Sequence, residues 1–201
     1  MLGRWLLSGV VAVLAATAAL LAYLLNAYRP VPVDPAWQAP GVANPAPGSV
    51  SVRFTGTSTL LFSDGDTHWM VDGWFSRPGP LDLLTGPIGP DVDAIAAGLA
   101  ANEVTELAAV IPVHSHYDHA MDAPEVARRT GALLLGSEAT ANIGRGWGLP
   151  EQQIRVLGDR EPVALGRFTL TAIASRHFQV PDPAVRERAL ANPAITEPLV
   201  P

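Results

Sequence analysis

The sequence of 201 residues contains no cysteine. Disulfide bonds, iron–sulfur clusters, cysteine-based zinc fingers and thiol nucleophiles are therefore excluded. Charged residues are scarce, at 16% of the chain, so the chain as a whole is not a solvated disordered segment. The 13 basic residues are outnumbered by 19 acidic ones and form no basic run. This composition predicts that the protein has no nucleic-acid partner.

One long stretch near the N-terminus has no charged residue at all. Trp5–Leu25 is a run of 21 mostly apolar residues, which as a helix would span about 30 Å, the thickness of a bilayer's hydrocarbon core. The stretch predicts an uncleaved transmembrane anchor over residues 1–28. The alternatives are a cleaved signal peptide, whose apolar region is typically only about 7–15 residues long, and a buried core helix. Arg4 and the free amino group favour a cytoplasmic N-terminus, with the domain on the extracytoplasmic side as part of a single-pass membrane protein.

Residues 29–48 read RPVPVDPAWQAPGVANPAPG and contain six prolines. Such a composition excludes helix and favours an extended, semi-rigid spacer. The sequence therefore predicts a linker here, followed by a folded domain over residues 49–201.

Within the domain, hydrophobic periodicity predicts an opening antiparallel meander and then alternating strands and helices. The meander comprises Ser49–Phe54, Thr59–Phe62 and Thr67–Val71, with a hairpin signal at Asp64-Gly65. The later strands are predicted at Ala108–Val113, Ala132–Leu135, Ile154–Leu157 and Phe168–Ala174, and the helices at Val92–Ala101 and about Ala123–Thr130. This order predicts an α/β fold.

Three local features refine this prediction. Asp122 is predicted to cap the helix that follows it, with Glu125 completing a capping box, and Gly131 is predicted to end that helix. Trp74–Pro90 is predicted as a long loop, and the glycine-rich segment Gly144–Gly148 as a turn without a phosphate-binding loop.

The segment most informative about function is His114-Ser115-His116-Tyr117-Asp118-His119. It lies directly after a predicted buried strand and before a predicted helix. Imidazole and carboxylate groups are ligands for zinc and similar metals. Residues two apart in extended chain point the same way, so His114 and His116 can meet one ion, while Asp118 and His119 can face a second.

The spacing His114-x-His116-x-Asp118-His119 resembles the signature of the metallo-β-lactamase superfamily. The meander VSVRFTGTSTLLFSDGDTHWMVDG also resembles that family's first strands, which end in an aspartate, here Asp72. The resemblance covers Ser49 to about Gln179. It implies a four-layer αββα sandwich and hydrolysis by a metal-bound hydroxide.

The resemblance also implies roles for individual residues. His114, His116 and His177 would bind the first metal, with His177 following the predicted strand that ends at Ala174. Asp118 and His119 would bind the second metal, and Asp118 would also orient the attacking water. Asp72 would orient a ligand, and His68 is interpreted as a structural or surface residue. The cofactor would be Zn²⁺, with two ions in a complete domain.

The context Ser175-Arg176-His177-Phe178 is similar to the branch that holds N-acylphosphatidylethanolamine phospholipase D and sugar-phosphate lactonases. After His177 there is no further histidine, and Asp182 is the only aspartate, so the domain is predicted to be the N-terminal part of the sandwich. The predicted function is a membrane-anchored hydrolase of an ester, lactone or phosphodiester, with a small-molecule or lipid substrate. The alternatives are a non-catalytic metal-binding or partner-binding module and a membrane-tethered scaffold, which would leave the histidines unexplained.

Overall fold

The computed structural model describes residues 2–27, 46, 48–175, 182–185 and 195–199. The chain divides into two compact units, Met1–Asn44 and Pro45–Pro201. Residues 28–45 and 47 lie outside the described part, so the predicted linker stays a prediction.

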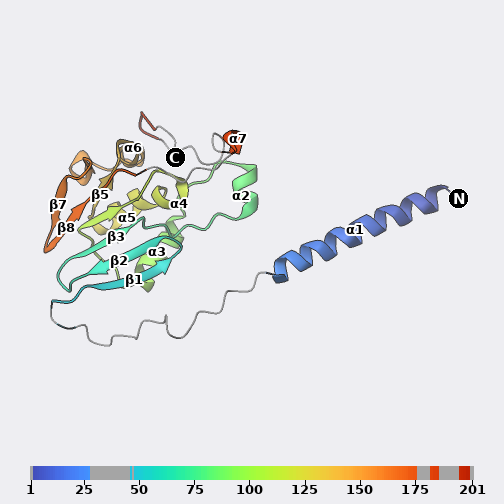
Figure 1. Ribbon diagram of the computed structural model, residues 1–201, viewed down its shortest axis with the longest axis horizontal. Coiled ribbons are helices and arrows are strands. Elements are labelled where there is room, and N and C mark those ends of the chain that lie inside the picture. The colour runs from blue at the N-terminus through green and yellow to red at the C-terminus, as the bar shows by residue number, and fades with distance from the viewer. Residues whose placement is uncertain (1, 28–45, 47, 176–181, 186–194, 200–201) are drawn as a thin grey trace. The chain divides into compact units, whose positions relative to one another are not determined.

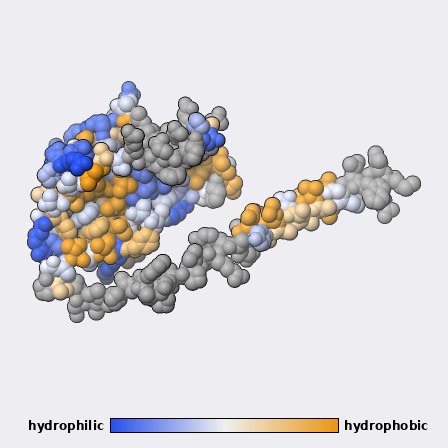
Figure 2. Space-filling model, viewed as in Figure 1, coloured by the Kyte–Doolittle hydropathy of each residue, from blue (hydrophilic) through white to orange (hydrophobic). Residues whose placement is uncertain are grey.

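The first unit contains one helix, α1 (Leu2–Ala27), with a largely hydrophobic described surface (Figure 2). The helix predicted over Trp5–Leu25 is therefore present. In the part of the chain that the structure describes, no helix has the combination of length and apolar character that crossing a membrane requires. The predicted transmembrane span is therefore not supported.

The second unit is built on a six-stranded sheet in which the strands follow one another in chain order (Figure 1). The strands are β1 (Ser51–Gly56), β2 (Thr59–Ser63), β3 (His68–Val71), β4 (Ala109–Ile111), β5 (Leu133–Gly136) and β6 (Ile154–Val156). The first three are antiparallel, as predicted, and β3 to β6 are parallel. Strands β7 (Pro162–Leu165) and β8 (Phe168–Thr171) form a separate antiparallel hairpin. The predicted α/β class is confirmed.

Alternation along the parallel strands divides the core between the two faces of the sheet. Met70, Val110 and Leu134 are in register and pack against the helices α3 (Val92–Ala101) and α5 (Ala123–Thr130). Their neighbours Trp69, Ala109 and Leu135 pack on the other face, with Val163 and Leu165 of the hairpin. Parallel strands that are covered on both faces carry continuous apolar runs, which is why β4 was recognisable. The sheet thus holds the end of β4 in a rigid frame.

The remaining helices are short and connect or flank the strands. They are α2 (Pro80–Thr85), α4 (Tyr117–Ala120), α6 (Glu138–Gly146), the 3₁₀ turn η2 (Glu151–Gln153) and α7 (Pro183–Val185). The segment predicted as the loop Trp74–Pro90 therefore includes a helix, α2. The turn predicted at Gly144–Gly148 is wrong up to Gly146, because α6 extends to that residue. The α6 helix is favoured by the Ser137 hydroxyl, which accepts from the Thr140 backbone N–H at 3.3 Å.

Helix α5 has the predicted bounds, but its predicted capping box is wrong. Asp122 occupies the N-cap position without a side-chain bond to the helix, because its carboxylate accepts hydrogen bonds from a distant loop. The carboxylate of Glu125 is engaged by arginine side chains instead. Gly131 does end the helix, with a left-handed φ of 72° that glycine adopts without strain.

Candidate metal centre

The histidine motif lies at the carboxyl end of β4, between two other parallel strands. Strand β4 ends at Ile111 and α4 begins at Tyr117, so residues 112–116 form a short connection in which His114 and His116 lie. The carboxyl ends of parallel strands are the usual location of ligand sites in open α/β sheets. Strand β4 and helix α4 therefore fix the motif from both sides.

The histidine rings of the motif are close together. The Nε2 atom of His114 lies 2.9 Å from the Nδ1 atom of His116, and the ring centroids of His114 and His119 are 4.1 Å apart. Two nitrogens that bind one tetrahedral zinc at about 2.0–2.1 Å would be about 3.3 Å apart. The observed distance between the His114 and His116 nitrogens is therefore only a few tenths of an ångström shorter than a shared zinc requires. This pair fits a zinc ion.

Asp72, which the family resemblance implied would orient a metal ligand, forms a hydrogen bond with His119. Its Oδ2 atom lies 2.8 Å from Nδ1 of His119, and its Oδ1 atom accepts from the backbone N–H of Val113 at 2.9 Å. Asp72 is buried and sits at the end of β3 with a φ of 61°. With Nδ1–H donating to the carboxylate, Nε2 of His119 keeps its lone pair for another partner.

Asp118 lies beside His119 and is more exposed than that histidine. Its Oδ2 atom lies 3.6 Å from Nε2 of His119, and its side chain is 40% exposed against 18% for His119. The structure thus brings together the predicted second pair, Asp118 and His119.

A complete ligand set is not assembled among the described side chains: no group of three or more histidine, aspartate or glutamate residues there converges on one point. His177 lies outside the described residues, so its predicted role stays a prediction. His68 lies on β3, where its backbone carbonyl accepts from the N–H of Ala108 at 2.7 Å, and its interpretation as a structural or surface residue stays a prediction.

Asp122 joins the motif to the loop after β3, a role that sequence reasoning missed. Its carboxylate accepts from the N–H groups of Phe75 and Ser76 at 2.7 and 2.6 Å and from the Ser76 hydroxyl at 2.8 Å. The Ser76 Oγ atom in turn accepts from the N–H of Asp91 at 2.7 Å. Asp122 is fully buried, and burial raises the pKa of its carboxyl although the hydrogen bonds from Ser76 and Phe75 oppose that shift. Asp122 thereby holds both ends of the loop 75–91, directly at Phe75 and Ser76 and through the Ser76 hydroxyl at Asp91.

Glu125 is a second buried carboxylate and lies on α5. Its carboxylate receives hydrogen bonds from Arg128 at 2.7 Å, from Arg129 at 2.6 Å and from the indole N–H of Trp147 at 2.9 Å. Burial alone would raise the pKa of this carboxyl, but these charged and polar donors lower it to about 2. The contact with Trp147 fixes the indole ring relative to α5.

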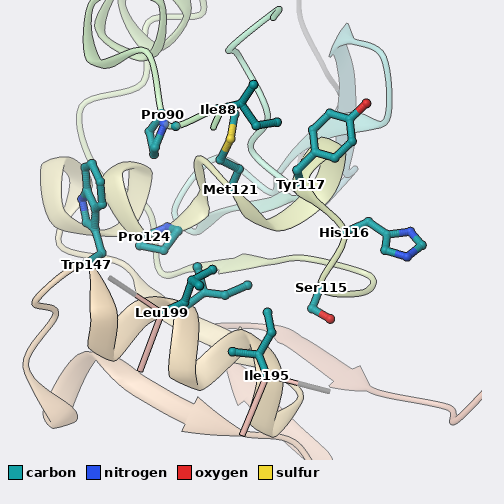
Figure 3. Close-up of a pocket in the computed structure, with 12 residues that line it drawn as sticks. Ile88, Pro90, Ser115, His116, Tyr117, Met121, Pro124, Trp147, Ile195 and Leu199 are labelled. Atoms are coloured by element: carbon teal, nitrogen blue, oxygen red, sulfur yellow. The ribbon is translucent and has the colours of Figure 1, made fainter. Parts of the chain in front are cut away.

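An apolar cavity of about 310 Å³ lies beside the motif (Figure 3). The lining comes from the loop after β3, the motif, the segment from Met121 into α5, the end of α6 with Trp147, and residues 195–199. The lining residues are Ile88, Gly89, Pro90, Ser115, His116, Tyr117, Met121, Pro124, Ile143, Trp147, Ile195 and Leu199. His116 is the one histidine among them.

One curated protein is similar in sequence to part of the chain. A UPF0173 metal-dependent hydrolase of Heliobacterium modesticaldum is 28% identical over 122 residues, which are 60% of this chain and 43% of that protein. This similarity confirms the predicted resemblance to a superfamily of metal-dependent hydrolases. The chain is similar to metal-dependent hydrolases, and it spans less than half the length of this relative. No protein-family model matches the chain.

Solved metallo-β-lactamases are similar to part of the chain. The metallo-β-lactamase SMB-1 is 22% identical, with a TM-score of 0.46, and the match covers 61% of this chain and 50% of that one. MEM-A1, a subclass B3 metallo-β-lactamase from a soil metagenome library, is 24% identical with a TM-score of 0.43, covering 63% and 49%. With TM-scores below 0.5 and identities below 25%, these similarities support no conclusion about function.

Proposed function

We propose that this chain is part of a metal-dependent hydrolase whose metal site is the motif after β4. The observation that carries the proposal is the gathering of three motif histidines, with His114 and His116 nitrogens 2.9 Å apart and His119 held by the buried Asp72. A carboxylate that orients a histidine through Nδ1 is the usual support of a histidine ligand. The similarity to a metal-dependent hydrolase supports the same conclusion.

The motif residues would have distinct roles in this site. His114 and His116 would hold one zinc ion together with His177, while Asp118 and His119 would hold a second. Bound zinc supplies a lowered pKa for a coordinated water and polarises the carbonyl or phosphoryl oxygen of the substrate. Asp118 would accept a hydrogen bond from the attacking water, which the partial exposure of its side chain to solvent allows.

The substrate class in this proposal is an ester, lactone or phosphodiester of a small molecule or lipid. The complete domain would be the four-layer sandwich of the superfamily. Attachment to a membrane through α1, with the domain on the extracytoplasmic side, rests on the absence of charge from Trp5–Leu25 and on the continuity of the helix over Leu2–Ala27. Alkaline carbonate washing of membranes tests the attachment, because release of the full-length chain would contradict an integral anchor.

Metal analysis of purified variants tests the metal site. We expect His114→Ala and His116→Ala to lose at least tenfold in zinc affinity, measured by competition with a chromogenic chelator. His68→Ala is the matched control, since this histidine lies outside the motif, and it should bind zinc like the unaltered chain. Equal zinc binding by all four proteins would refute the proposal. Zinc binding without hydrolysis of ester, lactone or phosphodiester substrates, even by the full-length gene product, would favour the non-catalytic module.

A further inference from the structure

The cavity beside His116 differs from the motif in chemistry. Apart from His116, Ser115 and Tyr117 at the motif, the lining consists of glycine, proline, aliphatic residues, methionine and one tryptophan. Among the residues that the structure describes, no aspartate, glutamate, lysine or arginine lines the cavity to solvate a polar group, and a volume of about 310 Å³ is near the lower end for a small-ligand site. The cavity is therefore suited to one apolar arm of a ligand rather than to a whole polar molecule.

The lining residues also give the cavity a direction. Figure 3 shows His116 and Ser115 on one side and Trp147 on the opposite side, with Met121 and Leu199 between them. A ligand arm that enters from the motif would therefore point toward Trp147.

Trp147 is held firmly enough to serve as an end wall. Its indole N–H donates to the buried carboxylate of Glu125 at 2.9 Å, and Arg128 and Arg129 fix that carboxylate in turn. The polar atom of the indole is thus satisfied outside the cavity, and an apolar ring face is available to the ligand. The side-chain amide of Asn142 on α6 donates to the Ile195 carbonyl at 2.9 Å, and the backbone N–H of Leu199 donates to the Asn142 carbonyl at 3.1 Å.

We infer that this cavity binds a straight aliphatic chain of the substrate, with the reactive group at His116 and the chain end against Trp147. Trp147 then determines the chain length that the site accepts. The inference rests on the proposed function for the reactive end, but the cavity itself needs no metal. Met121 and Leu199 lie between the two ends, and their adaptable side chains favour an alkyl chain, whose contour they can follow, over a rigid polycyclic group.

Displacement of the apolar dye N-phenyl-1-naphthylamine by methyl esters of straight-chain fatty acids tests the inference. The chain is kept in excess chelator, so that the result is independent of metal binding. Each methylene that enters the cavity should tighten binding about fourfold, the equivalent of about 0.8 kcal/mol. Affinity should stop rising at the length at which the chain reaches Trp147. In Trp147→Ala that limit should move to longer esters by at least two carbons, and in Trp147→Phe by less.

Phe54→Ala is the matched control, because Phe54 is an exposed aromatic residue outside the cavity. It should leave the length limit unchanged, and far-ultraviolet circular dichroism establishes that each variant is folded. Met121→Trp, which narrows the cavity from its side, should weaken all esters at least tenfold. An unchanged length limit in a folded Trp147→Ala, or the absence of ester binding by the unaltered chain, would overturn the inference. Normal zinc binding in the same samples would show that the proposed function survives that failure, and ester binding without zinc binding would show the reverse.

Discussion

Two carboxylates that lie three residues apart, Asp122 and Glu125, are both fully buried but have opposite pKa shifts. Asp122 is surrounded by neutral donors, two backbone N–H groups and a serine hydroxyl, so that burial dominates and its pKa is raised. Glu125 meets two guanidinium groups, and its pKa falls to about 2. The charge of the partners, rather than the depth of burial, decides the protonation of each acid.

The two acids also connect different parts of the fold. The partners of Asp122 lie 46 and 47 residues earlier in the chain, in the loop that supplies Ile88 and Pro90 to the cavity. The charged partners of Glu125 lie on its own helix, and only Trp147 comes from elsewhere. Asp122 therefore fixes tertiary structure, whereas Glu125 mainly fixes one side chain at the cavity's far end.

The largest expected effect is that of removing the acceptor at Asp122. Asp122→Ala leaves the N–H groups of Phe75 and Ser76 and the Ser76 hydroxyl without their acceptor. With a cost of about 1–3 kcal/mol for each buried unsatisfied group, the free energy of unfolding should fall by about 4 kcal/mol in urea titrations. Asp122→Asn, which keeps one acceptor oxygen, should lose less than half as much. Equal losses in the two variants would show that the hydrogen bonds do not account for the effect.

Sequence patterns predicted those features of the fold that depend on residues close together in the sequence. The bounds of α3 and α5 and the opening antiparallel meander followed from local periodicity, and the motif histidines came together because they lie within six residues of one another. The roles of Asp122 and Trp147 could not be predicted, because their partners Ser76 and Glu125 are distant in sequence and no local pattern marks the pairing. The cavity was missed for the same reason, since its walls come from several separate segments.

Acid titration separates Glu125 from Asp122. The pKa of Glu125 is about 2 in the folded chain against an ordinary 4.5, so its stabilisation is present above about pH 4.5 and is lost as the pH falls toward 2. The loss should be on the order of 2 kcal/mol, less than the full shift implies, because the Arg128 side chain is 58% exposed. Asp122 contributes with the opposite sign, since its raised pKa favours the folded state as the pH falls.

Urea unfolding at several pH values between 5 and 2.5, for the unaltered chain and for Glu125→Gln, measures this difference. The glutamine variant should be less stable at pH 5 and should lose less stability on acidification. Glu138→Gln is the control, because Glu138 pairs with Arg145 at the surface and its side chain is 64% exposed. If the Glu125→Gln and unaltered chains lose stability in parallel, the arginine partners do not lower the pKa of Glu125 as described.

A third buried acid, Asp72, extends the comparison to the metal centre, because its partner is a motif histidine. Asn in place of Asp72 can still accept from the N–H of Val113, and asparagine tolerates the left-handed φ of 61° at this position. Its amide group would, however, donate toward Nδ1 of His119, which places the histidine proton on Nε2 and removes the lone pair that a zinc ion needs.

Substitution of a residue that orients a metal ligand typically costs 10- to 100-fold in metal affinity. Here the loss should be near tenfold, about 1.4 kcal/mol, because the second ion is assigned only two ligands of this chain, Asp118 and His119, and should be held more weakly than the first. Zinc titrations of Asp72→Asn measure it, with Asp66→Asn as the control, since that aspartate is 85% exposed and pairs only with Arg167. A second-ion affinity unchanged in Asp72→Asn would mean that His119 does not bind zinc through Nε2, while loss of the first ion as well would mean that Asp72 supports the motif as a whole.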